Sequence, residues 1–175
     1  MVTLRPVVES DLRVFEEDLA TETGSGEHQW FGFTPVQTMR RQFVESGLLA
    51  KESGMLTVVV DGEVAGRVAW LPASWGRETS LCWTIAAGLR PHLRGRGYGT
   101  QAQRLLVDYL FRHTRAERIQ AFTDVANVAE QKALERAGFT REGVLAAAQW
   151  RDGAWHDQVL YAIVRSSWAP STSSG

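Results

Sequence analysis

Cysteine, long apolar runs and an excess of one charge are all lacking in this chain. Cys82 is the only cysteine among 175 residues, which excludes an intramolecular disulfide and a zinc site built from several cysteines. No apolar run approaches the roughly 20 residues of a membrane helix. The N-terminus, from Met1 to Pro6, lacks the charged and apolar regions of a signal peptide. We therefore expect a cytoplasmic protein with no membrane partner.

The balance of charge argues against a nucleic-acid partner. Nineteen basic residues face 20 acidic ones, for a net charge of -1, whereas nucleic-acid binders usually carry a basic excess that neutralises phosphates. The composition, 44% hydrophobic and 22% charged, is that of a globular protein. The length suffices for one domain, which we place at residues 1–165. The Ser-, Thr- and Pro-rich residues 166–175 predict a flexible C-terminal tail.

The first half of the chain predicts a strand, two helices and a three-stranded meander. Ser10 is a candidate N-cap, and Pro35 suits the first position of a helix. Asp61-Gly62 lies between two β-branched segments and is typical of a tight hairpin turn, because both central residues need positive φ. The expected elements are a strand at 3–5, helices at 10–20 and 34–46 around a loop at 21–34, and strands at 56–60, 64–71 and 79–89.

The second half has a different pattern. A loop rich in glycine and arginine at residues 90–99 leads into an amphipathic helix. Gly138 is suited to end a later helix, and Asp152-Gly153 predicts a second tight hairpin turn. The expected elements are helices at 98–112 and 127–137 and strands at 118–123, 139–150 and 155–164. This order predicts an α/β chain with a mixed sheet.

The glycine-rich loop is the most informative segment of the chain. Its sequence, Arg94 to Thr100, places three alternating glycines just before the helix. Glycine allows close approach of the backbone to a ligand, and a helix start presents unpaired N–H donors and positive dipole. Arg94 and Arg96 add charge and forked donors suited to phosphate. Together these features predict a cradle for an anion, most naturally a pyrophosphate.

Three other interpretations of this loop are possible: a Walker loop, a dinucleotide loop, and a connection that binds no ligand. A Walker loop is excluded because no Gly-Lys-Ser/Thr is present. Gly97 to Ala102 fits the dinucleotide pattern G-x-G-x-x-G/A, with Asp124 placed as the ribose-binding acid, so a nicotinamide-dependent oxidoreductase remains an alternative. The preceding antiparallel meander argues against it. A glycine-rich connection with solvated arginines is the simplest alternative.

Several segments resemble the GNAT family of N-acetyltransferases. Arg94 to Gly99 matches the family's acetyl-CoA loop, Q/R-x-x-G-x-G/A, and residues 127–140 resemble its second CoA helix with the Gly-Phe exit. Residues 151–157 and the opening Thr3 to Pro6 are similar to the RimJ/RimL-like branch, which acetylates ribosomal proteins. The resemblance covers residues 3 to about 164.

The resemblance implies a fold, a cofactor and a binding site. The fold is a mixed, mostly antiparallel sheet with flanking helices, in which the strand ending at Leu89 splays from the strand at 118–123. The cofactor is acetyl-CoA, and no metal is implied. The residues expected to hold the cofactor are Ala87, Leu89, Arg94, Gly95, Arg96, Gly97, Tyr98, Gly99, Thr100 and Asn127.

The resemblance also implies direct attack of a neutral amine on the thioester in a ternary complex. A base is needed near pH 7, because alkyl amines have pKa values of about 10. Glu130, with Asn127, is the first candidate for this catalytic work. Glu130 departs from many relatives, which carry Ser or Tyr there as the proton donor. Asn127 and Glu130 also have the spacing of a capping box, a purely structural role.

The acceptor cannot be named from the sequence, although its site can be outlined. The resemblance places the acceptor beside the loop at 21–34, and we expect Glu27, Trp30 and Trp83 to bind it. Glu22 and His28 are further candidates, and His92 lies beside the cradle. The acceptor is an amine, either a peptide N-terminus or a small molecule. A second possible function is that of a non-catalytic acyl-CoA-binding or sensor domain. A homodimer is a possible oligomeric state.

Overall fold

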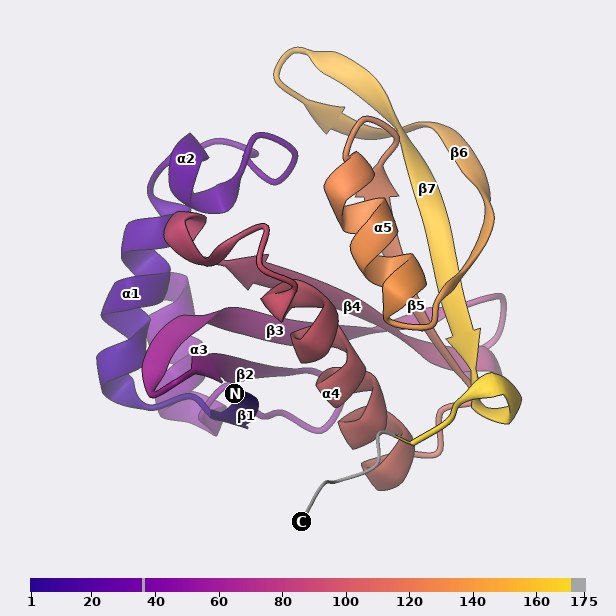
Figure 1. Ribbon diagram of the computed structural model, residues 1–175, viewed down its shortest axis with the longest axis horizontal. Coiled ribbons are helices and arrows are strands. Elements are labelled where there is room, and N and C mark those ends of the chain that lie inside the picture. Colours follow the sequence, from indigo (N-terminus) through magenta and orange to yellow (C-terminus); the bar gives the residue numbers. More distant parts are fainter. Residues whose placement is uncertain (36, 171–175) are drawn as a thin grey trace.

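The computed structural model describes residues 1–35 and 37–170, which form a seven-stranded sheet flanked by helices (Figure 1). The strand order is β1-β2-β3-β4-β5-β7-β6, and every neighbouring pair is antiparallel except β4–β5. This confirms the predicted fold class. The strands are β1 (Val2–Pro6), β2 (Gly54–Val60), β3 (Glu63–Ser74), β4 (Leu81–Leu89), β5 (Arg118–Asp124), β6 (Thr140–Arg151) and β7 (Ala154–Val164). The helices are α1 (Glu9–Leu19), α2 (Glu22–Ser25), α3 (Gln37–Ser46), α4 (Tyr98–His113) and α5 (Val128–Arg136).

Two Asp-Gly turns fix the hairpins. Asp61 and Gly62 have φ of 48° and 87°, and Asp152 and Gly153 have φ of 48° and 75°. Positive φ at both central residues matches the right-handed twist of the flanking strands. The predicted β2–β3 and β6–β7 hairpins are therefore confirmed.

The parallel contact between β4 and β5 is short. Only Trp83 pairs with Ile119 and Thr84 with Gln120, after which the two strands diverge. The Gln120 side chain reinforces this junction by donating to Thr84 Oγ1 at 3.1 Å. Figure 1 shows the divergence as an opening between the β1–β4 half of the sheet and the β5–β7–β6 half. The predicted splay is confirmed.

Each face of the β1–β4 half is covered by helices. Leu56 and Val58 of β2 pack into the main core with Leu106 and Leu110 of α4. Met55 points to the opposite face, because successive strand residues alternate. That face packs on a smaller cluster of Val7, Leu12, Phe15 and Leu48, in which α1 supplies Leu12 and Phe15 and against which Met39 and Phe43 of α3 pack.

Local capping differs from the prediction at the first helix. The helix begins at Glu9, with Val8 as its N-cap, because the Asp11 carboxylate accepts the Val8 N–H at 3.0 Å. Ser10 is therefore not the cap. The segment expected as a loop contains the short α2, which Thr21 caps by accepting from Gly24 N–H at 3.0 Å. A four-residue helix is too short to produce a periodic pattern.

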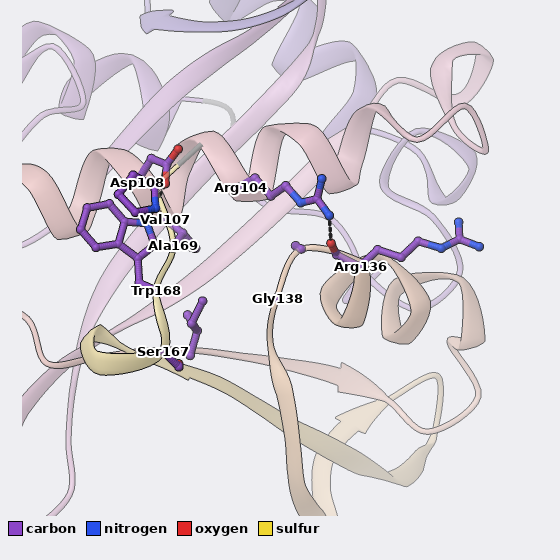
Figure 2. Close-up of a pocket in the computed structure, with 11 residues that line it drawn as sticks. Arg104, Val107, Asp108, Arg136, Gly138, Ser167, Trp168 and Ala169 are labelled. Atoms are coloured by element: carbon purple, nitrogen blue, oxygen red, sulfur yellow. Dashed lines mark hydrogen bonds between the residues drawn. The ribbon is translucent and has the colours of Figure 1, made fainter. Parts of the chain in front are cut away.

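The chain stays packed beyond the point where a flexible tail was predicted. A 3₁₀ turn spans Arg165–Ser167, and Trp168 then lies against Phe111 with its Nε1 donating to Asp108 at 2.7 Å. Figure 2 shows Trp168 and Asp108 together, with Arg104 reaching the Arg136 carbonyl and so linking α4 to α5. The predicted start of the tail at residue 166 is corrected accordingly. Residues 171–175 of that tail lie outside the described residues.

No helix in residues 1–35 and 37–170 is both long enough and apolar enough to cross a membrane.

Candidate functional site

A cavity of about 460 Å³ lies at the opening between β4 and β5. Three parts of the chain form its walls: the α2 segment, the end of β4 with the glycine loop and the start of α4, and α5. The residues that line it are Ser25, Gly26, Glu27, His28, Gln29, Ala87, Gly88, Leu89, Arg94, Gly95, Gly97, Gly99, Thr100, Gln103, Asn127, Ala129, Glu130, Lys132, Ala133 and Arg136. Most of the predicted site residues are thus brought together.

The glycine loop has the geometry expected of an anion cradle. Gly95 and Gly97 adopt φ of 74° and 80°, a conformation that favours glycine. A Cβ atom at either position would meet nothing within 4 Å, so the backbone borders open space. The first helical hydrogen bond of α4 runs from the Gln101 N–H to the Gly97 carbonyl. The N–H groups of the three residues before Gln101 therefore have no acceptor within the helix. These donors and the positive end of α4 face the cavity where Gly99 and Thr100 line it.

Arg94 and Arg96 do not have the phosphate-binding geometry that the sequence predicts for them. The Arg94 guanidinium donates to Leu89 O at 2.9 Å, to Thr23 O at 3.1 Å and to Gly24 O. Its donors therefore hold α2 against the end of β4 instead of forming a free fork for phosphate. Arg96 is exposed and does not belong to the lining, and Tyr98 packs against the main core.

Asn127 and Glu130 lie at the start of α5. Asn127 Oδ1 accepts the Glu130 N–H at 3.2 Å, which makes Asn127 the N-cap. The reciprocal half of a capping box is missing, because Asn127 N–H donates to Asp124 O at 2.9 Å. The Glu130 carboxylate accepts instead from Gln103 Nε2 at 2.6 Å.

The environment of Glu130 suits proton transfer near neutral pH. Burial raises the pKa of Glu130 to about 7, against the opposing effect of the Gln103 hydrogen bond. A carboxyl group with this pKa can accept a proton from an ammonium and also donate one. Gln103 itself is buried in α4, and its Oε1 has no hydrogen-bond partner among the described residues.

The predicted acceptor residues separate into two groups. Glu27 lines the cavity, and so does the half-buried His28, whose Nε2 lies 3.2 Å from the Glu27 carboxylate. Trp83 does not line it: the indole is buried in the core and donates to Thr114 Oγ1 at 3.1 Å. Strand alternation turns that side chain toward the helix, so the predicted role of Trp83 is wrong. Trp30 packs edge-on against Phe33 outside the lining.

Two further candidates lie away from the cavity. Glu22 is the exposed first residue of α2 and does not contribute to the lining. His92 is also exposed, and its Nε2 lies 2.8 Å from a carboxylate oxygen of Glu63.

Two cations on α5 were missed by the sequence reasoning. Lys132 and Arg136 line the cavity together with Ala129 and Ala133. These positions are three to four residues apart, so they occupy one helix face. That periodicity is visible in the sequence, although nothing there showed which face borders the cavity.

The dinucleotide interpretation of the glycine loop is wrong. Asp124, its expected ribose-binding acid, is buried and forms an ion pair with Arg151 at 2.5 Å. The sheet has a single parallel pair instead of the repeated parallel units of a dinucleotide fold. Residues 1–35 and 37–170 contain no cluster of three or more His, Cys, Asp or Glu side chains able to hold a metal ion.

Comparison with known proteins agrees with this geometry. The model of the acetyltransferase (GNAT) domain family matches residues 1–140. YjcK of Bacillus subtilis (strain 168), named as a probable N-acetyltransferase, is 37% identical over 70 residues, which cover 40% of this chain and only 39% of YjcK.

Solved structures establish the fold over nearly the whole chain. The spermidine N-acetyltransferase from Vibrio cholerae, solved with CoA and spermine, has a TM-score of 0.80 at 18% identity, covering 95% of this chain and 96% of that chain. RimL, a ribosomal L7/L12 alpha-N-protein acetyltransferase solved with CoA, has a TM-score of 0.77 at 21% identity, covering 95% of each chain.

Proposed function

Since the chain belongs to the acetyltransferase (GNAT) domain family, we propose that it transfers the acetyl group of acetyl-CoA to a primary amine. One observation carries the proposal: a single cavity at the strand divergence holds both the glycine cradle of α4 and a carboxyl group whose pKa is about 7. The cradle suits a pyrophosphate, and the carboxyl group suits proton transfer from an amine.

The cavity walls fit the cofactor. Backbone N–H groups of Gly97 to Thr100 would hold the pyrophosphate, and the edge of β4 at Ala87 to Leu89, past its last pair with β5, would hold the pantetheine arm. Lys132 and Arg136 would add positive charge at the rim of the cavity, where phosphates carry negative charge. When bound, acetyl-CoA supplies the thioester that the amine attacks.

Glu130 and Asn127 would do the catalytic work. Glu130 would accept a proton from the incoming ammonium, which leaves the amine neutral and nucleophilic, and could return a proton to the leaving thiolate. Asn127 fixes the backbone at Glu130 through its cap and lies within reach of the same ligand, because both residues line the cavity. The carboxyl group of Glu130 would thus serve in place of the Ser or Tyr found in many relatives.

The acceptor proposal rests on the similar proteins and on the cavity wall. RimL is named for a protein α-amine and the Vibrio enzyme was solved with spermine, so both amine classes belong in a first screen. We propose that Glu27 helps to bind the cationic acceptor, since it is exposed at the cavity wall. An α-amino group on a peptide would agree with the RimJ/RimL-like motifs at residues 3–6 and 151–157.

We also propose a cytoplasmic homodimer. The sheet ends at β6, a twelve-residue edge strand that is largely exposed, and Val144, Leu145 and Trp150 add apolar surface along it. Such an edge can pair with another copy. The single buried cysteine is in keeping with a reducing compartment. Sedimentation of the purified chain tests the dimer directly.

Thermal unfolding with acetyl-CoA, CoA and NAD in parallel tests the central proposal. A ligand at 100 times its Kd adds about 2.7 kcal/mol, which raises Tm by about 5 to 11 °C for a domain of this size. We expect this shift with acetyl-CoA and CoA but not with NAD. No shift with acetyl-CoA would refute the proposal. Tight binding without turnover on any amine would favour a non-catalytic sensor domain.

A further inference from the structure

A buried carboxylate lies behind the cavity at the end of β5. Asp124 is only 2% exposed. Its Oδ1 accepts the Ala126 N–H at 2.8 Å, and its backbone carbonyl accepts the Asn127 N–H at 2.9 Å. Asp124 therefore shapes the turn that leads into α5, and with it the wall that carries Asn127 and Glu130.

The other oxygen of Asp124 reaches toward the opposite wall. Asp124 Oδ2 lies 2.5 Å from Arg151 Nη2 and 3.3 Å from His156 Nδ1. Arg151, at the end of β6, is 8% exposed, and its Nη1 donates to the backbone carbonyl of Glu27 at 2.7 Å. His156 braces the arrangement, because its Nε2 lies 3.1 Å from the Arg151 carbonyl. One guanidinium thus joins β5, β6 and the segment at residues 26–29.

The electrostatics favour a fixed arrangement. Burial alone would raise the pKa of Asp124, but the hydrogen bonds from Ala126 N–H and Arg151 and the positive charge of Arg151 hold it below its ordinary value. The carboxylate stays ionised at neutral pH and keeps the guanidinium in place. A charge-assisted bond from a guanidinium is stronger than a neutral one, so the Glu27 carbonyl is firmly held.

We propose that Arg151, oriented by Asp124, is a positioning residue that fixes residues 26–29 as the acceptor wall of the cavity at a set distance from α5. This inference rests on the proposed function, because residues 26–29 and Glu130 would face the acceptor from opposite sides. The segment has no strand neighbour of its own, and α2 before it is only four residues long. A turn bond from Gln29 N–H to Gly26 O at 2.9 Å closes the segment on itself but does not tie it to the sheet. The Arg151 bond to Glu27 O makes that connection.

Two substitutions test this role. Arg151→Met removes the guanidinium with its bonds to Asp124 and to Glu27 O. Arg151→Lys keeps a positive charge beside Asp124 but cannot reproduce the two-sided contact. We expect both variants to raise the KM for the acceptor about tenfold or more, with the Kd for acetyl-CoA within twofold of wild type. The assay uses spermine and a short peptide with a free α-amino group. Amide hydrogen exchange should become faster at residues 24–29 in both variants.

Arg118→Met provides a matched control. Arg118 also pairs with a carboxylate, that of Glu142 on β6, at 2.8 Å and 2.5 Å, but it does not belong to the cavity lining. An equal rise in acceptor KM in this control would overturn the proposal, as would unchanged exchange at residues 24–29 in folded Arg151→Lys. If the wild type acetylates neither amine, the proposed function fails, while hydrogen exchange still decides the positioning role.

Discussion

Replacing Glu130 by glutamine should make the stability difference between variant and wild type depend on pH. The pKa of Glu130 is about 7 in the folded protein, against an ordinary value of 4.5. In the unfolded chain the carboxyl group loses its proton at the lower pH. Between pH 4.5 and 7 the folded state therefore binds one more proton, and stability falls as the pH rises.

The size of the effect follows from the two pKa values. One pKa unit corresponds to about 1.36 kcal/mol. The difference between the folded-state and unfolded-state pKa values of Glu130 therefore corresponds to about 3 kcal/mol. Below pH 4.5 Glu130 is protonated in both states and does not change the free energy of unfolding. Above pH 7 the ionised carboxylate lowers that free energy by its full amount. Glutamine cannot ionise. The free energy of unfolding of Glu130→Gln should therefore rise by about 3 kcal/mol relative to that of wild type between pH 4.5 and 7.5.

Urea unfolding at several pH values between 4.5 and 7.5 measures this difference without a ligand or an acceptor. Subtracting wild type from variant cancels the other titrating groups, and Glu45→Gln on the exposed surface of α3 serves as the control. A constant difference across this range would refute the raised pKa and remove the basis for acid–base work by Glu130. In turnover assays, the variant should also lose the inflection near pH 7 in kcat/KM.

Three further predictions concern the cradle, the fold and the acceptor. Gly99→Ala should lower the affinity for acetyl-CoA at least tenfold in calorimetry while Tm holds or rises, because φ is ordinary there and the new Cβ meets only Leu89 Cδ1 at 3.7 Å. Asp11→Asn should cost about 3 kcal/mol in urea unfolding at pH 7, because Asp11 is buried and accepts from Arg5 at 2.6 Å. Trp30→Ala should raise the acceptor KM, because Trp30 directly follows residues 26–29, which line the cavity.

Each of these has a contrary outcome. Unchanged acetyl-CoA affinity in folded Gly99→Ala would contradict the close approach of the backbone at residue 99 to the ligand. Although burial opposes it, the hydrogen bond from Arg5 holds the pKa of Asp11 below its ordinary value of 3.8. The contribution of Asp11 is therefore present above that value and disappears as the pH falls through the folded pKa, so an equal cost at pH 2.5 would contradict the argument. An acceptor KM unaffected by Trp30→Ala would exclude that tryptophan.

Local rules predicted most of the fold. Asp61-Gly62 and Asp152-Gly153 determine two turns through backbone conformation alone, and Gly138 ends α5 with φ of 100° as expected. The rules failed at the start of α1, where the deciding bond is local but comes from the third residue of the helix instead of from the cap residue. Asp11 moved the start of α1 through a bond to Val8 N–H, which a search for Ser or Thr caps cannot detect.

The site was predicted in part for the same reason. A glycine pattern requires only backbone conformation, so Gly95 and Gly97 could be placed from the sequence. Side-chain direction depends on packing across the fold. Arg94 turns to three carbonyl oxygens contributed by β4 and α2, and Trp83 turns into the core. Neither the carbonyls nor the helix that covers Trp83 is adjacent in the sequence.

The short β4–β5 junction also bears on how long the protein survives in a cell. Two residue pairs join the halves of the sheet, helped by side-chain bonds of Gln120 with Thr84 and with Trp75 Nε1, so the backbone ladder contributes little to keeping them together. A ligand bound in the proposed site would supply hydrogen-bond partners where strand pairs are missing and would add its binding energy to the junction. Without ligand, partial opening is easier and exposes cleavable chain. Proteolytic lifetime would therefore follow the supply of acetyl-CoA.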